Sequence, residues 1–281
     1  MSINIEYNGR IAIITLDNEK KLNTLSHQLY SRLAQLMREV AARNDIYITL
    51  LTGKGRYFSA YAIYSVDQEV VSDIYISGVD MTTSHAAPDN DQRRHYLHRF
   101  VNVFEVSNSF STHPKILITA LNGPVVGLSA AIIAHSDFIY ATPQAYLLTP
   151  YSSLGLVAEG GSSWAFVQRL GISKANEVLL MSKRIVSEEL VHCGFVNRVF
   201  ETDKTGNTFL EQVVREINER LGENLNGESL LKIKALVREP YCRTLDAQMM
   251  LEMLGNVERY MQGIPQEAFK NIATGKKKHK L

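Results

Sequence analysis

The sequence has few cysteines and no excess of charge of either sign. Two cysteines, Cys193 and Cys242, are too few for a disulfide framework or for a four-ligand zinc site on their own, and a reducing compartment is the default. With 30 Lys and Arg against 29 Asp and Glu, the formal net charge is +1. No overall field therefore attracts nucleic acid or an anionic membrane surface, and we expect neither as a partner.

We also expect neither a secretory leader nor a membrane span in this sequence. The first ten residues, MSINIEYNGR, lack the basic and then apolar pattern of a signal peptide. The 21 residues between Lys115 and Asp137 carry no full charge and are long enough to cross a bilayer. Asn122-Gly123-Pro124 interrupts them, and a proline inside a helix removes a donor and clashes with the preceding turn. The stretch therefore predicts a strand, a turn and a buried helix.

What is present indicates an α/β protein. The chain has 281 residues, of which 45% are hydrophobic and 21% charged, as in ordinary globular proteins. Residues 11–16 and 46–51 are apolar runs of strand length. Between them Ser26 is a candidate helix N-cap, followed by apolar residues spaced by four, three and four: Leu29, Leu33, Leu36 and Val40. Strand, helix and strand within about fifty residues form a βαβ unit, which implies a parallel sheet.

Further along the chain, strand signals give way to helical ones. Residues 58–94 are polar and aperiodic and predict a loop. The expected strands after it are 116–121, 138–141 and 145–148, and the expected helices are 97–110, 127–134, 187–193, 208–221, 229–237 and 245–260. We divide the chain into a core of residues 1–200, a helical region of 201–275 and a basic tail of 276–281.

The common catalytic motifs do not occur in the sequence. There is no G-x-x-x-x-G-K-[ST], G-x-S-x-G or H-E-x-x-H, and no G-x-G-x-x-G follows a strand. The eight histidines are scattered singly, and His135 on an apolar helix is predicted to be a core residue whose ring nitrogens are satisfied. We therefore expect no metal site.

Three segments remain as candidates for chemistry. Residues 54–62 leave a strand and run into small residues, and residues 121–131 leave a strand through a tight turn into a helix whose first amides have no intrahelical partner. Residues 154–161 place Glu159 among apolar residues and glycines. Taken alone, each segment is as typical of a structural role, in close helix packing or at a helix start, as of a catalytic one. Together, two amide donors and a carboxylate are the groups needed to form and quench an enolate.

These segments resemble the crotonase (enoyl-CoA hydratase/isomerase) superfamily, and within it the fungal peroxisomal Δ3,Δ2-enoyl-CoA isomerases. The resemblance runs from about Ile11 to the C-terminus and is strongest in LNGPVVGLSAAIIAHSDFIYA and YLLTPYSSLGLVAEGGSS. It implies a crotonase-like spiral of βαβ units with a helical C-terminal oligomerisation region, and a homotrimer or hexamer. It also implies an acyl-CoA substrate and no separate cofactor, because coenzyme A is part of the substrate.

The resemblance assigns roles to individual residues. Ala62 and Leu128 match the positions whose backbone N–H groups form the family's oxyanion hole, and Glu159 matches the isomerases' catalytic base. Asn102 lies near the position of an asparagine that positions this base. The two glutamates of the hydratases correspond here to Ala131 and Tyr151, so hydratase activity is not expected.

The reaction implied is a proton shift in a 3-enoyl-CoA, cis or trans, that gives 2-trans-enoyl-CoA in the β-oxidation of unsaturated fatty acids. Glu159 removes a C2 proton and returns it at C4, and an apolar wall made by Leu154, Leu156 and Val157 raises its proton affinity. Two alternatives stay open. One is a dienoyl-CoA isomerase, which would normally show a second acidic residue in the site. The other is a weakened or non-catalytic acyl-CoA-binding relative, because Tyr61 and Ile63 depart from the family's usual loop.

The last residues of the chain indicate a destination. His279-Lys280-Leu281 resembles the S-K-L address that a peroxisomal import receptor reads, and lysines precede it. A solvated basic end is the plainer interpretation. Together with the fatty-acid chemistry, the tail predicts import into the peroxisomal matrix.

Overall fold

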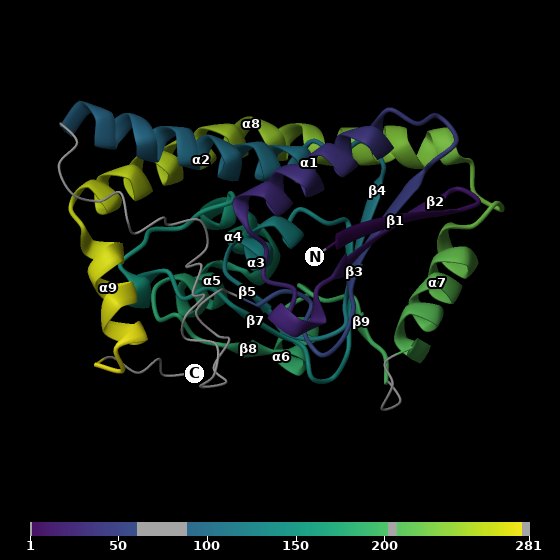
Figure 1. The fold of residues 1–281 in the computed structure, drawn as a ribbon. Coiled ribbons are helices and arrows are strands. Elements are labelled where there is room, and N and C mark those ends of the chain that lie inside the picture. Colours follow the sequence, from purple (N-terminus) through teal and green to yellow (C-terminus); the bar gives the residue numbers. More distant parts are fainter. Residues whose placement is uncertain (1, 61–88, 202–206, 277–281) are drawn as a thin grey trace.

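The computed structural model describes residues 2–60, 89–201 and 207–276, and its centre is a sheet of six strands (Figure 1). The strand order is β1-β2-β3-β4-β6-β9; β1 pairs antiparallel with β2, and all other neighbours are parallel. These strands are β1 (Ser2–Asn8), β2 (Ile11–Asp17), β3 (Ile48–Gly53), β4 (Ile116–Leu121), β6 (Phe138–Ala141) and β9 (Arg198–Val199). A smaller sheet joins β5 (Val125–Val126), β7 (Tyr146–Leu148) and β8 (Ile185–Val186).

The predicted βαβ unit is confirmed. Helix α1 (His27–Ala41) connects β2 to the parallel strand β3, with Ile11 opposite Ile48 in the register. The side chain of Ser26 accepts a hydrogen bond from the Leu29 amide at 3.4 Å, so Ser26 is the N-cap. The helix packs one apolar stripe on the sheet, made by Tyr30, Leu33, Ala34, Leu36, Met37 and Val40.

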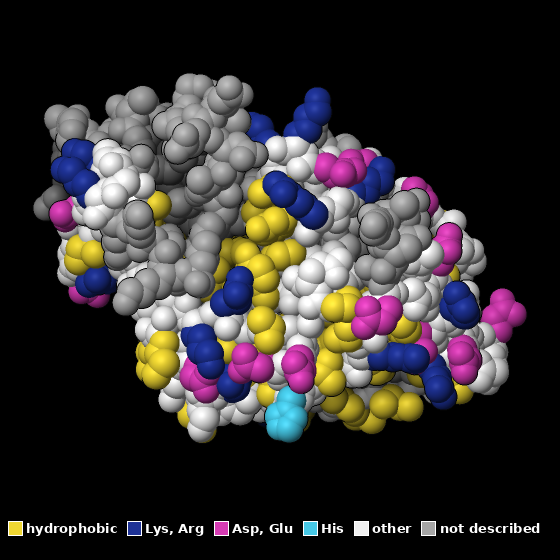
Figure 2. All heavy atoms as spheres, turned by 90° about the horizontal axis from the view of Figure 1, so that it is seen from below, with side chains coloured by type: hydrophobic (Ala, Val, Ile, Leu, Met, Phe, Trp, Pro, Cys, Tyr) yellow, Lys and Arg dark blue, Asp and Glu magenta, His cyan; other side chains and the backbone are white. Residues whose placement is uncertain are grey.

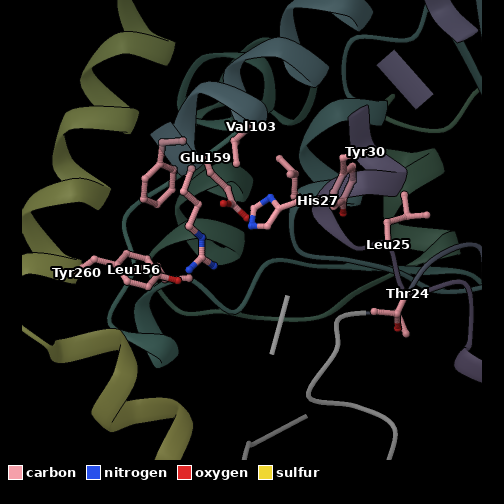
Figure 3. Close-up of a pocket in the computed structure, with 12 residues that line it drawn as sticks. Thr24, Leu25, His27, Tyr30, Val103, Leu156, Glu159 and Tyr260 are labelled. Carbon is pink, nitrogen blue, oxygen red and sulfur yellow. The ribbon is translucent and has the colours of Figure 1, made fainter. Parts of the chain in front are cut away.

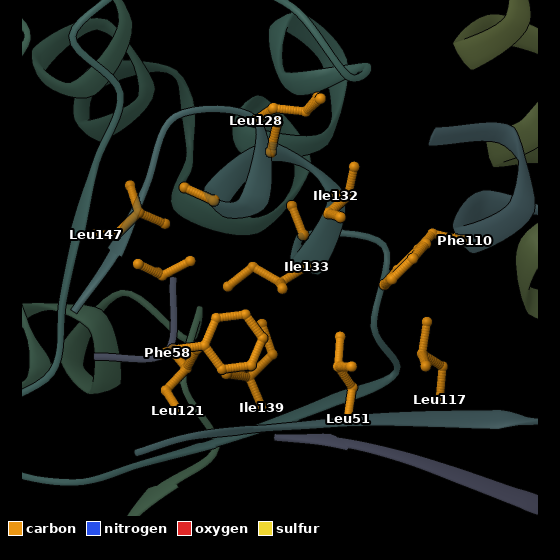
Figure 4. Packing of buried hydrophobic residues seen from close by; sticks show 14 of the residues in the cluster. Leu51, Phe58, Phe110, Leu117, Leu121, Leu128, Ile132, Ile133, Ile139 and Leu147 are labelled. Atoms are coloured by element: carbon orange, nitrogen blue, oxygen red, sulfur yellow. The ribbon is translucent and has the colours of Figure 1, made fainter. Parts of the chain in front are cut away.

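Hydrophobic side chains cover both faces of the six-stranded sheet. On one face, α3 (Leu128–Ile133) packs into a core with residues of the sheet; Figure 4 shows Ile132 and Ile133 among Leu51, Leu121 and Ile139. On the other face, α7 (Asn207–Leu221) buries three side chains against the strands, which are Phe209, Val213 and Ile217. Burial on both faces explains why β3 and β4 carry mostly apolar side chains on both of their faces.

The C-terminal region is helical, as predicted, but its longest helix is continuous. We expected separate helices at 229–237 and 245–260, and this is wrong because one helix, α8, spans Gly227–Met261 with Pro240 inside it. Its 35 residues extend about 50 Å. It packs against α2 (Asp89–Ser111) and α4 (Ser162–Leu170).

The remaining helices complete the scaffold around the site. They are α5 (Ile172–Leu179), α6 (Ser187–His192) and α9 (Ile264–Ala273), which packs on the end of α8. Helices α1, α2 and α8 lie along one side of the molecule (Figure 1). Within the described ranges, no helix combines the length and the apolar character that crossing a membrane requires. The predicted division into a core, a helical region and a tail stays a prediction.

Candidate active site

A pocket opens between the start of α1, the middle of α2, the start of α3 and the end of α8, and Glu159 lies in it. Figure 3 shows the carboxylate of Glu159 and the imidazole of His27 pointing toward one another, with Tyr260 on the far side. Polar lining comes from Thr24, His27, Tyr30, Arg99, Glu159 and Tyr260. Apolar lining comes from Leu25, Ala60, Phe100, Val103, Leu128 and Leu156. A carboxylate in a largely apolar cleft is suited to acid–base chemistry on a poorly polar substrate.

Two glycines set the turn that carries Glu159. Gly160 and Gly161 have φ of +70° and +78°, in the left-handed region that glycine occupies without strain. A Cβ on Gly160 would lie 2.8 Å from the Cβ of Ala131 and 3.0 Å from Cδ1 of Leu128. The missing side chain therefore lets the turn approach the first residues of α3, so that Glu159 and Leu128 line one pocket.

Side chains of helix α8 form hydrogen bonds with the turn that carries Glu159. The side-chain amide of Asn256 donates to the carbonyl of Ala158 at 2.9 Å and accepts from the amide of Val157 at 3.2 Å. Glu252 accepts from the amides of Gly161 at 2.7 Å and of Ser163 at 2.8 Å. Backbone groups on both sides of Glu159 are thus fixed by side chains of one helix, which is the kind of support that a reacting group needs.

His135 supports the same turn from the interior. Its Nε2 lies 2.9 Å from the carbonyl of Gly160 and its Nδ1 lies 3.1 Å from the hydroxyl of Tyr241. Both ring nitrogens therefore have partners, and the prediction of a satisfied core histidine is confirmed. Burial lowers the pKa of His135 to about 4, so its ring is neutral at neutral pH.

The environment of Glu159 favours the protonated, neutral form of its side chain. Burial, and then the nearby Glu252 carboxylate, raise the pKa of Glu159 to about 7, while Arg99 acts in the opposite direction. Of the apolar wall that we predicted, Leu156 lines the pocket. Leu154 instead lies in the core beneath it, and Val157 packs against Gly255 of α8. A base with a pKa near the working pH combines proton affinity with a useful ionised fraction.

Three other titratable side chains of the pocket, those of His27, Tyr30 and Tyr260, stay neutral near pH 7. Burial, followed by the charge of Arg99, lowers the pKa of His27 to about 4, and its Nε2 is buried without a hydrogen-bond partner. Burial raises the pKa of Tyr260 to about 12 and that of Tyr30 further. Among the described lining residues, Glu159 is therefore the one that changes charge near pH 7.

The start of α3 lines the pocket next to the turn that carries Glu159. Leu128 is the first residue of this helix, so its N–H has no intrahelical acceptor. A chain of hydroxyls holds the helix start in place, running from Tyr30 to Ser129 at 2.9 Å and from Ser129 to Ser59 at 2.8 Å. Residues 58–60 run beside β5, where the Ser59 carbonyl accepts from the Val126 amide at 3.0 Å.

The remaining sequence predictions have mixed outcomes. Ala62, Tyr61 and Ile63 lie outside the described residues, so the role of the Ala62 amide stays a prediction; the described Ala60 nearby lines the pocket. Asn102 lies on α2 but is not among the described lining residues, where Arg99, Phe100 and Val103 represent this helix. Its predicted role stays a prediction.

Sequence reasoning missed Asn256, Glu252, His27 and Arg99. The first two meet the Glu159 turn only through the packing of α8, about ninety positions further along the chain, and no sequence spacing shows this. Ser26 as an N-cap placed His27 at the start of α1, but which side of that start faces the site follows only from the fold.

Comparisons with known proteins agree with this geometry. The family model described as enoyl-CoA hydratase/isomerase matches residues 6–261. A Delta(3,5)-Delta(2,4)-dienoyl-CoA isomerase of Pyricularia oryzae is 48% identical over 282 residues, which cover 99% of this chain and 98% of the relative. A 3,2-trans-enoyl-CoA isomerase of Saccharomyces cerevisiae is 29% identical over 99% of this chain and 96% of its own length. A crystal structure of an enoyl-CoA hydratase/isomerase from Pseudoalteromonas atlantica T6c superposes with a TM-score of 0.79, covering all of both chains at 22% identity, which supports the fold alone.

Proposed function

The chain belongs to the enoyl-CoA hydratase/isomerase family, and we propose that it is an isomerase that moves carbon–carbon double bonds in acyl-CoA thioesters. The observation that carries the proposal is the position of Glu159, a buried carboxylate that lines one pocket with the start of α3; burial raises its pKa to about 7. Both relatives described above are named as isomerases of such substrates.

The proposed mechanism begins with Glu159 ionised and the thioester oxygen facing the start of α3. Glu159 takes a proton from C2, and the electron pair delocalises onto the thioester oxygen as a dienolate. The N–H of Leu128, and that of Ala62 as the sequence predicts, donate to this oxygen. One such donor contributes about 3 kcal/mol to transition-state stabilisation. The proton then returns at a more distant carbon, and the double bond ends in conjugation with the thioester.

Hydration is the less suitable reaction for this site. Adding water needs groups that handle both the water and the α-carbon, and the resemblance puts those groups at Ala131 and Tyr151. Ala131 is a buried alanine in contact range of Gly160, and Tyr151 is buried with its hydroxyl toward the carbonyl of Gly127 at 3.5 Å. Neither position supplies a carboxylate, so a proton shift by one carboxylate fits the described pocket better.

Two substrate classes share the first step and differ in where the proton returns. A 3-enoyl-CoA takes the proton back at C4, within reach of one carboxylate, and gives 2-trans-enoyl-CoA. A 3,5-dienoyl-CoA takes it back at C6 and gives the 2,4-diene. Glu159 is the one carboxylate among the described residues that line this pocket, with Glu252 in the cavity behind it, and this favours the first class. The 48% identity to a protein named for the second class favours the second.

Measuring turnover of both substrates tests the proposal. We expect wild-type protein to form the conjugated product, followed by ultraviolet absorbance, from at least one of 3-hexenoyl-CoA and 3,5-octadienoyl-CoA. Glu159→Gln keeps the shape of the side chain but cannot take a proton, so turnover should fall by about 10²- to 10⁴-fold. Acyl-CoA binding by calorimetry without turnover would instead support the non-catalytic relative.

Two further expectations from the sequence are proposals as well. We propose import into peroxisomes through His279-Lys280-Leu281, which lies outside the described residues; a fluorescent protein bearing the last residues should then form peroxisomal puncta, and a cytosolic signal would contradict this. We also propose that the chain self-associates through α8, a point developed at the scale of the whole molecule below.

A further inference from the structure

A second buried carboxylate lies close to Glu159 and is not explained by the proton shift. Glu252 is on α8, with 6% of its surface exposed. It lines a small cavity behind the pocket together with Glu159, Ser107, Met249 and Asn256. Two carboxylates around one cavity interact strongly, so the ionisation of one depends on the charge of the other.

The hydrogen bonds of Glu252 favour its ionised form. One of its oxygens accepts from the Gly161 amide at 2.7 Å and the other from the Ser163 amide at 2.8 Å. Both donors belong to the first turn of α4, where the helix dipole adds positive charge. Burial raises the pKa of Glu252, whereas the hydrogen bonds from Ser163 and Gly161 act in the opposite direction and favour its ionised form. The charge of Glu252 in turn raises the pKa of Glu159.

Glu252 acts on Glu159 in two ways. Its negative charge opposes ionisation of the neighbouring carboxyl, and it also occupies helix amides that would otherwise stabilise a second anion nearby. We infer that Glu252 is a positioning residue that fixes the turn bearing Glu159 and sets the pH at which Glu159 becomes a base. This inference rests on the proposed function for its catalytic meaning, although the electrostatic coupling does not depend on it.

Among the described residues, the other titratable groups that line the pocket with Glu159 come from three helices. His27 and Tyr30 of α1 are neutral at neutral pH, and so is Tyr260 of α8. Arg99 of α2 is the charged group that opposes Glu252. Asn256 holds the same turn as Glu252 but carries no charge. Asn256 therefore offers a control that separates positioning from charge.

The test compares pH profiles of kcat/KM for four proteins. In Glu252→Gln the acid limb should move to lower pH by about one unit, because the charge is lost and one helix amide is freed. Glu252→Asp retains the charge, so its limb should stay at the wild-type position even if turnover falls. Asn256→Ser should lower turnover without moving the limb. A limb that stays in place in Glu252→Gln, or moves equally in Asn256→Ser, would overturn the inference.

A stability measurement gives a second readout that needs no activity. Glu159→Gln changes how the free energy of unfolding depends on pH between 5 and 7.5, and this change should be smaller in the Glu252→Gln background than in wild type. An equal change in both backgrounds would count against the coupling. An inactive wild type with unequal changes would reject the proposed function and leave the coupling standing.

Discussion

At the scale of single residues, the molecule stabilises Glu159, the base that we propose, in the protonated form that cannot accept a proton. The pKa of Glu159 is raised from 4.5 to about 7, so the folded state holds this proton more tightly than the unfolded chain does. The stability gained is complete below pH 4.5 and is lost as the pH rises through 7, which is where the base becomes active. A site that needs a neutral-pH base therefore costs stability at neutral pH.

The Glu159→Gln variant should recover this loss. Because glutamine stays uncharged, its advantage over wild type should grow by about 1 to 3 kcal/mol between pH 5 and pH 7.5. Urea unfolding of both proteins at several pH values measures this difference. A constant difference across the range would show that Glu159 is not desolvated as described.

Three histidines make the free energy of unfolding depend on pH in the opposite direction. They are present in both wild type and Glu159→Gln. Burial, as the largest cause, lowers the pKa of His27 and His135 to about 4 and that of His113 to about 3. Their contribution is present above pH 6.5 and is lost as the pH falls toward these values. The absolute stability of each protein should therefore fall in acid, while the difference between them isolates Glu159.

At the scale of elements, what the sequence predicts depends on how local the cause is. Strands β4 and β6 begin and end where the apolar runs do, because both are buried on two faces. Strand β1, at an edge of the sheet, was missed although Ile3, Ile5 and Tyr7 alternate with Asn4 and Glu6, which is the pattern of a strand with one buried face. Strands β5, β8 and β9 have two residues each and exist only through their partners. Glu159 was singled out from its local pattern and Leu128 from the family resemblance, and both line the pocket. The side chains of α8 that hold the Glu159 turn depend on tertiary packing and have no local signal.

The attachment of α8 to the sheet rests on a buried ion cluster. Asp137, next to β6, accepts from Lys234 at 2.7 Å and from Arg238 at 2.8 Å, and also from the Leu117 amide at 2.8 Å. Burial alone would raise the pKa of Asp137, but the two cations hold it below the usual value. This cluster fixes the first half of the helix whose second half holds the Glu159 turn.

Removing the central charge should therefore be costly. Asp137→Asn leaves two cations without their anion in a largely buried place, and we expect a loss of about 3 kcal/mol in the free energy of unfolding. Urea denaturation measures it, with Glu39→Gln as the control. Glu39 pairs with Arg32 at the surface at 3.1 Å, so its loss should cost less than about 1 kcal/mol. Equal effects of the two substitutions would mean that the cluster does not anchor α8.

At the scale of the whole molecule, basic and acidic side chains are evenly mixed, whereas exposed large apolar side chains are concentrated on one helix. Basic and acidic side chains alternate over the face shown in Figure 2, as the net charge of +1 suggests. Helix α8, by contrast, exposes large apolar side chains along its length, which are Ile233, Leu236, Val237, Met250, Leu251 and Leu254. At 100° per residue these six fall within an arc of about 140°, on the side of the helix opposite the face that packs on the core.

Such a row of exposed apolar side chains is suited to packing against a second copy of the chain. Leu236 is 76% and Leu251 62% exposed, and together with their neighbours they form a patch of the kind that marks interfaces. Closed homo-oligomers are the commonest assemblies, and a row on one long helix can serve each copy alike. We therefore expect a mass in light scattering that is a multiple of 31.6 kDa, consistent with the trimer or hexamer predicted from the sequence.

Substitutions on that row should dissociate the assembly. Leu236→Glu combined with Leu251→Glu introduces charge on the row without touching buried groups, so the mass should fall toward that of one chain while the circular dichroism spectrum is retained. Leu180→Glu is the matched control, since Leu180 is 68% exposed but lies at the end of α5, away from the row. Dissociation by the control but not by the double variant would place the interface elsewhere, and a wild-type mass of one chain would end the proposal of self-association. If the double variant is monomeric and still active, the pocket is complete within one chain, as the lining residues from α1, α2, α3 and α8 of a single copy indicate.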